Sequence, residues 1–81
     1  MYGFRIAIHN HVSGETKTYC VTNHFSMVEA CSELKAYLEF KPEDRLTHTF
    51  HCIGYAPKQH TDIQVDAQYE YVYEACDTMP D

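Results

Sequence analysis

The sequence has no Trp, only three Gly, no C-x-x-C pair and no long apolar run. A membrane-spanning helix needs about 18 or more consecutive apolar residues, so none is expected. Without a C-x-x-C pair, neither a zinc ribbon nor a thioredoxin-type redox motif is predicted. The glycines are isolated, which excludes a Gly-rich phosphate-binding loop. The first residues, MYGFR, also lack the basic and then apolar pattern of a signal peptide.

Basic residues are scarce. Six Lys and Arg face twelve Asp and Glu, which leaves a net charge of -6. Direct binding of nucleic acid through its phosphates needs a positive patch, so we expect none. The 81 residues, of which 44% are hydrophobic, suit one globular domain over 1–81. The four cysteines lie at positions 20, 31, 52 and 76, and we interpret them as reduced thiols of a cytoplasmic protein.

Periodicity predicts a hairpin followed by a helix. Phe4, Ile6 and Ile8 alternate with polar residues, and after a turn near Gly14 the chain returns, so residues 4–22 are predicted to be a β-hairpin. Ser26 and Glu29 form a capping box, in which the serine oxygen accepts from the Glu29 amide and the glutamate reaches back to the serine amide. An apolar stripe at three- and four-residue spacing then predicts a helix over 27–40, followed by a loop over 42–45.

The second half of the chain predicts two more strands. Residues 46–55 read as a strand in either of two registers: one buries Leu46, Phe50 and Cys52, and the other buries Ile53 and Tyr55. Residues 63–75 alternate cleanly, and a helix there would have no apolar side, so a long strand is favoured. The predicted fold is α+β, a four-stranded antiparallel sheet with one helix packed on one face. Its order is β-β-α-β-β, two hairpins flanking the helix.

Negative charge gathers near the C-terminal end of the chain. Residues 62–81 contain six acids and no base. On the predicted strand, a row of outward-facing carboxylates results, formed by Asp62, Asp66, Glu70 and Glu74. One interpretation is a solvated face that prevents edge-to-edge pairing. The other is an acidic strip that docks on a basic protein surface.

Histidine is abundant, with six residues, and His9 and His11 share one face of the first strand. These two are candidate metal ligands, although no spacing resembles a zinc finger and we expect no cofactor. A nucleophile assembled from Cys52 with His51 or His48 is disfavoured, because consecutive strand residues point to opposite faces and no orienting third group is present. We therefore do not expect an enzyme.

The hairpin 4–22, the capped helix 26–40 and the long acidic strand 63–75 together carry a resemblance. A chain built in this way resembles the small acidic inhibitor proteins of phages and mobile elements, anti-CRISPR proteins among them. The resemblance implies stoichiometric blocking of a nucleic-acid-binding surface, in some cases by imitation of phosphate charge.

The leading hypothesis is a non-enzymatic interaction module that inhibits a nucleic-acid-handling protein complex of a host, such as a defence complex. The four carboxylates of the acidic row would provide charge complementarity to a basic surface. Tyr71 and Tyr73 would provide aromatic anchors. A small metal-binding protein using His9 and His11 and a homodimer pairing through its edge strand remain alternatives.

Overall fold

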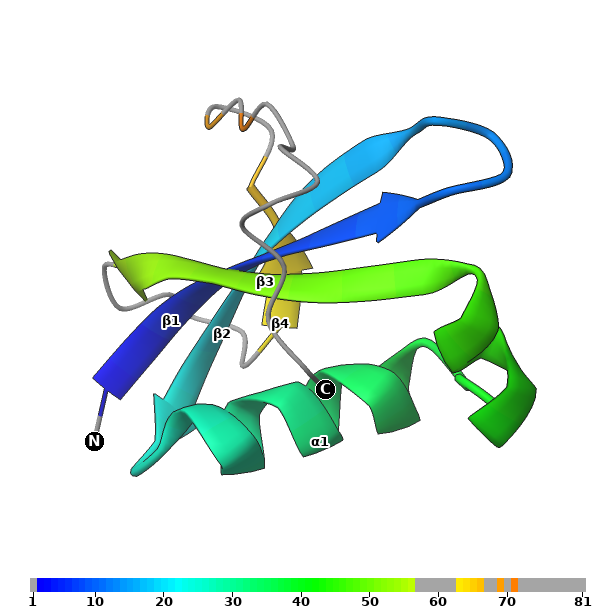
Figure 1. Ribbon diagram of the computed structural model, residues 1–81. Coiled ribbons are helices and arrows are strands. Elements are labelled where there is room, and N and C mark those ends of the chain that lie inside the picture. The colour runs from blue at the N-terminus through cyan, green and yellow to red at the C-terminus, as the bar shows by residue number, and fades with distance from the viewer. Residues whose placement is uncertain (1, 57–62, 67–68, 70, 72–81) are drawn as a thin grey trace.

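The computed structural model describes residues 2–56, 63–66, 69 and 71. Its elements, in chain order, are β1 (Tyr2–Asn10), β2 (Thr16–His24), α1 (Met27–Tyr37), the short 3-10 helix η1 (Pro42–Leu46), β3 (His48–Ala56) and β4 (Ile63–Val65). The strands form one antiparallel sheet in the order β3-β1-β2-β4. Helix α1 lies against one face of this sheet (Figure 1). The predicted α+β class and element order are confirmed, with η1 where a loop was expected.

The predicted N-terminal hairpin is present, and its turn is held by local polar contacts. The Oδ1 atom of Asn10 accepts hydrogen bonds from the backbone amides of Val12 and Ser13. Gly14 has a φ of 79°, a left-handed conformation that glycine adopts without steric cost. Because β1 ends at Asn10, His11 lies in the exposed turn and not on the strand.

The described strands β3 and β4 do not pair with each other, so the expectation of a second hairpin was wrong. β3 pairs with β1, and β4 pairs with β2, at opposite edges of the sheet. β1 and β2 are therefore the two central strands, and their side chains are buried on both faces of the sheet. Ile6 and Val21 are fully buried on the α1 side, and Ala7 and Cys20 are at most 2% exposed on the other side.

The main core lies between α1 and the sheet. Ala30, Cys31 and Leu34 are the buried residues of α1, in agreement with the predicted stripe. They pack against the buried side chains of the sheet, which are Phe4, Ile6, Ile8, Tyr19, Val21 and Phe50.

The start of α1 is capped as predicted, with one difference. Ser26 Oγ accepts a hydrogen bond from the Glu29 amide at 3.3 Å. The Glu29 carboxylate accepts from the amide of Phe25 at 3.3 Å, one residue before the amide that the capping box predicts. The first interaction satisfies one of the amides that a helix start leaves without an intrahelical partner, and the second ties the residue before the cap to the first turn of α1.

Helix α1 ends three residues before the predicted boundary. Glu39 adopts a left-handed φ of 57°, and its amide donates to the carbonyl of Ala36. The amide of Phe40 donates to the carbonyl of Lys35 at 2.9 Å. This pair of bonds is the Schellman motif, which closes the helix before Pro42 is reached.

A β-bulge decides the register of β3, for which the sequence left two alternatives. Ile6 pairs with Cys52 and Arg5 pairs with Gly54, so Ile53 is an extra residue on β3. The bulge reverses the alternation of side chains along β3. Phe50 and Tyr55 therefore both face the α1 side of the sheet, although they belonged to different predicted registers. Leu46 belongs to η1 and is 81% exposed, so its predicted burial was wrong.

The predicted strand over 63–75 is not continuous. Among the described residues β4 ends at Val65, and the amide of Tyr69 donates to the carbonyl of Asp66 at 3.2 Å. This bond engages the Tyr69 amide with its own segment and not with a neighbouring strand. Residues 67–68, 70 and 72–75 lie outside the described residues.

Candidate functional site

Asp66, the described member of the predicted acidic row, points inward. Its Oδ2 atom lies 2.9 Å from Nε of Arg5 and accepts a hydrogen bond from Sγ of Cys20 at 3.3 Å. The side chains of Arg5 and Asp66 are 28% and 13% exposed, so the predicted solvent-facing orientation of Asp66 was wrong. Asp62, Glu70, Glu74 and Tyr73 lie outside the described residues.

The physical reason is that the sheet face opposite α1 is covered. Asp66 follows Gln64, which pairs with Cys20, so alternation places Asp66 on the same face as Cys20 and Arg5. The sequence assigned this face to solvent. Instead, the guanidinium carbon of Arg5 lies 4.8 Å from the ring centroid of Tyr69. Arg5, Cys20, Asp66 and Tyr69 together form what we call the Arg5 cluster.

Tyr71 also contacts this face. Its hydroxyl forms a hydrogen bond with Nδ1 of His51, and the two rings meet edge to face at 5.0 Å. Tyr71 is half-buried, so it is not the freely exposed anchor that the sequence suggested. Asp66, Tyr69 and Tyr71, the described residues after β4, thus all contact side chains on the sheet face opposite α1.

Burial keeps the described sheet thiols protonated. Burial, followed by the hydrogen bond to the Asp66 carboxylate, raises the pKa of Cys20 to about 11. Burial also raises the pKa of Cys52. The thiolate is the reactive form of cysteine, so neither residue has the lowered pKa of an activated nucleophile.

The hydrogen bond from Arg5 to Asp66 raises the pKa of the guanidinium. An arginine is cationic at every physiological pH, so this pair stays charged. The ion pair between Arg5 and Asp66 therefore has a structural role in the Arg5 cluster. Because it is part-buried, loss of either charged partner should destabilise the fold.

The rings of His9 and His11 lie side by side, with centroids 5.0 Å apart, although only His9 belongs to the strand on which the sequence placed both. His9 Nδ1 hydrogen-bonds with Thr16 Oγ1 at 2.8 Å, and His11 Nε2 with Thr49 Oγ1 at 2.5 Å. Burial, and secondarily His11, lower the pKa of His9. Within the described part of the chain, no group of three His, Cys, Asp or Glu side chains is placed to hold a metal ion.

The solvent-facing side of α1 was not among the functional surfaces predicted from the sequence. This side, which we call the outer face of α1, consists of Val28, Glu29, Ser32, Glu33, Ala36 and Tyr37, all of them exposed. Val28 is 76% and Tyr37 61% exposed, and Phe25, just before the helix, is 68% exposed. The sequence does indicate this face, since Val28 and Tyr37 are large side chains that fall outside the apolar stripe that predicted the helix.

Comparison with known proteins finds no matching family model, curated protein or solved structure. In the described residues, neither α1 nor η1 has the length and apolar character of a membrane-spanning helix. Inferences about function therefore rest on the surface chemistry of this chain alone.

Proposed function

We propose that this chain is a small non-enzymatic interaction module that docks on a basic surface of a partner protein. The partner class that fits is a nucleic-acid-handling protein, because such proteins carry basic grooves. The module would act as a stoichiometric inhibitor that occupies the groove, as the resemblance to small acidic phage and mobile-element inhibitors implies.

The outer face of α1 is the observation that carries the proposal. It combines two exposed carboxylates, Glu29 and Glu33, with the exposed side chains of Val28 and Tyr37, and it contains no Lys or Arg. Aromatic side chains supply much of the binding energy in protein interfaces, while charges steer association and select partners. This surface therefore matches a partner that is positively charged and has an apolar pocket.

Charge outside the described residues supports the same partner. Those stretches contain five acids, Asp62, Glu70, Glu74, Asp77 and Asp81, and one base, Lys58. With Asp66 engaged by Arg5, the docking role proposed for the acidic row passes to Asp62, Glu70 and Glu74, with Tyr73 as a further aromatic candidate. A cationic partner would experience this charge at long range, mainly as a faster association.

The test begins with capture of a partner from host lysate, followed by measurements on the purified pair. Glu33→Lys combined with Tyr37→Ala alters the outer face of α1, and Glu70→Lys combined with Glu74→Lys alters the acidic row. Glu15→Lys, in the exposed hairpin turn, is the matched control. We expect one-to-one binding that displaces nucleic acid from the partner, and association that slows in each double variant but little in the control.

The salt dependence of the association rate separates the two surfaces. A double variant that removes part of this dependence identifies the surface that meets the partner. Unchanged affinity and unchanged salt dependence in both double variants would rule out acidic docking. Binding without displacement of nucleic acid would reject the inhibitor role.

A further inference from the structure

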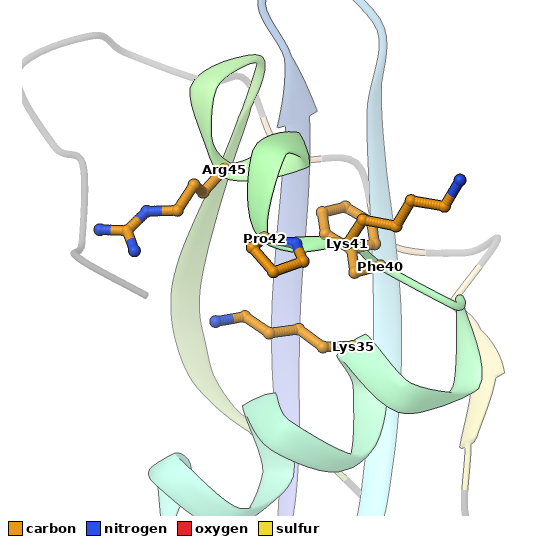
Figure 2. A pocket seen from close by; sticks show the side chains of 5 residues that line it. All are labelled: Lys35, Phe40, Lys41, Pro42 and Arg45. Carbon is orange, nitrogen blue, oxygen red and sulfur yellow. The ribbon is translucent and has the colours of Figure 1, made fainter.

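Half of the Lys and Arg residues of this acidic chain gather around one cavity. The cavity has a volume of about 280 Å³ and lies between the C-terminal end of α1 and η1. Its lining consists of Lys35, Phe40, Lys41, Pro42 and Arg45 (Figure 2). Of the described residues that line it, three are cationic and none is acidic, although acids outnumber bases two to one in the sequence.

We propose that this cavity binds a small phosphate dianion, free or as a monoester. This inference concerns a site separate from the outer face of α1 and does not depend on the proposed function.

Lys35 and Arg45 are the pair that would contact the anion. Figure 2 shows the Lys35 ammonium and the Arg45 guanidinium extending to the same side of the Pro42 ring, whereas the Lys41 ammonium extends to the other side. The planar fork of arginine matches phosphate oxygens with two parallel hydrogen bonds, and lysine adds a compact charge. Lys41 would contribute through its field at longer range.

The wall of the cavity is held by packing. Phe40 meets the rings of His48 and Phe50 edge to face, at centroid distances of 4.9 and 5.1 Å. Lys35 Nζ lies 5.2 Å from the centroid of Phe50, a cation–π contact that positions the ammonium. Because Phe40 and Lys35 are already held in place, they lose less conformational entropy when an anion binds.

Three acids, Glu39, Glu43 and Asp44, are sequence neighbours of the lining residues, and none of them lines the cavity. Asp44 lies between lining residues, but its Oδ2 atom accepts a hydrogen bond from the backbone amide of Lys41 at 2.9 Å. This contact helps to close the first turn of η1 and engages the carboxylate in the turn. The charged side chains that line the cavity are all cationic.

Size and net charge restrict the ligand to a small one. Pockets for drug-sized molecules span about 300–1,000 Å³, so this cavity suits a compact ligand. A long polyanion such as nucleic acid would meet the repulsion of a chain with net charge -6. A dianion confined to the cavity meets Lys35 and Arg45 first, and Phe40 and Pro42 offer an apolar surface for a monoester group.

The experiment titrates the isolated full chain with inorganic phosphate, with phenyl phosphate and with glutarate, and follows backbone amide shifts by NMR at constant ionic strength. We expect saturable shifts centred on residues 35 and 40–45 for the phosphates. If phenyl phosphate binds more tightly than inorganic phosphate, the cavity is assigned to a phosphate monoester. If the two bind equally, it is assigned to free phosphate. Glutarate binding as tightly as phosphate would overturn the phosphate assignment.

Three variants test the residues. Arg45→Gln changes an exposed side chain, and we expect it to weaken binding by roughly tenfold, the loss typical of one charged hydrogen bond. Lys35→Met removes the charge but keeps an aliphatic stem over Phe50, and we expect a similar loss. Lys17→Gln, an equal charge change outside this cavity, is the control.

Shifts that do not saturate, or equal weakening in the control and in Arg45→Gln, would overturn the proposal, because either result indicates non-specific charge attraction. Unchanged amide spectra of the unliganded variants establish that each variant is folded.

Discussion

At the scale of single residues, Asp66 shows how a tertiary contact changes the role of a charged side chain. In the sequence it is one of four acids at four-residue spacing. In the fold it is paired with Arg5 at 2.9 Å and accepts from the Cys20 thiol. A part-buried carboxylate with two donors stabilises the fold and has little capacity left for a partner.

Replacement of Asp66 tests this role. We expect Asp66→Ala to lower the free energy of unfolding by about 1–3 kcal/mol, because Arg5 and Cys20 lose their acceptor in a part-buried site. Asp66→Asn keeps an acceptor without the charge and should lose less. Urea denaturation followed by circular dichroism measures both.

The control is Glu15→Gln, in the exposed turn, which should change the free energy of unfolding by no more than about 0.5 kcal/mol. If Asp66→Ala behaves like this control, Asp66 faces solvent and the ion pair has no structural role.

At the scale of elements, a recognisable capping motif closes each end of α1. Ser26 caps the first turn, and the Schellman motif at Glu39 and Phe40 closes the last one. Only the first was recognised in the sequence, because Glu39 is an unusual residue for a left-handed position, where glycine is preferred. Pro42 indicated how far the helix could extend, but the helix ends earlier, at Tyr37.

Loss of the cap gives a prediction for α1. We expect Ser26→Ala to cost about 1 kcal/mol of stability, because the Glu29 amide loses its side-chain acceptor. Ser32→Ala is the matched control on the outer face of the same helix, where alanine is the better helix former and no loss is expected. Thermal unfolding of the two variants makes the comparison, and equal midpoints would show that the Ser26 contact does not stabilise α1.

At the scale of the whole molecule, the charge of -6 acts over distances comparable with the protein itself. The radius of gyration is 11.8 Å. Between about 0.01 M and about 0.1 M salt the screening length shortens from ~30 Å to ~10 Å. Repulsion among the acids therefore reaches across the molecule in dilute buffer and is largely screened at moderate salt.

Thermal stability should follow this screening. We expect the melting temperature to rise by roughly 4 °C over that salt range, the shift that slightly under 1 kcal/mol produces in a domain of this size. A variant with both Glu15→Gln and Glu33→Gln carries less negative charge and should show a smaller rise. A melting temperature that falls with salt would mean that attractive pairs such as Arg5 with Asp66 outweigh the repulsion.

The sequence alone determined the class of fold and the main apolar face. Alternation over residues 4–22 and the helical stripe through Ala30 and Leu34 are local patterns, and each corresponds to an element that buries those residues. The Ser26 cap was likewise readable, since its partner is three residues away. Such features depend on backbone geometry within a few positions, which the order of residues sets directly.

Tertiary structure decided the pairing of the strands, the bulge in β3 and the direction of the acidic side chains. β3 and β4 join opposite edges of the sheet, so β1 and β2 become its two central strands and bury side chains on both faces. Arg5 and Asp66 are 61 positions apart, and Lys35 and Arg45 belong to different elements. Contacts at such separations depend on packing of the whole chain, so no local pattern could have revealed them.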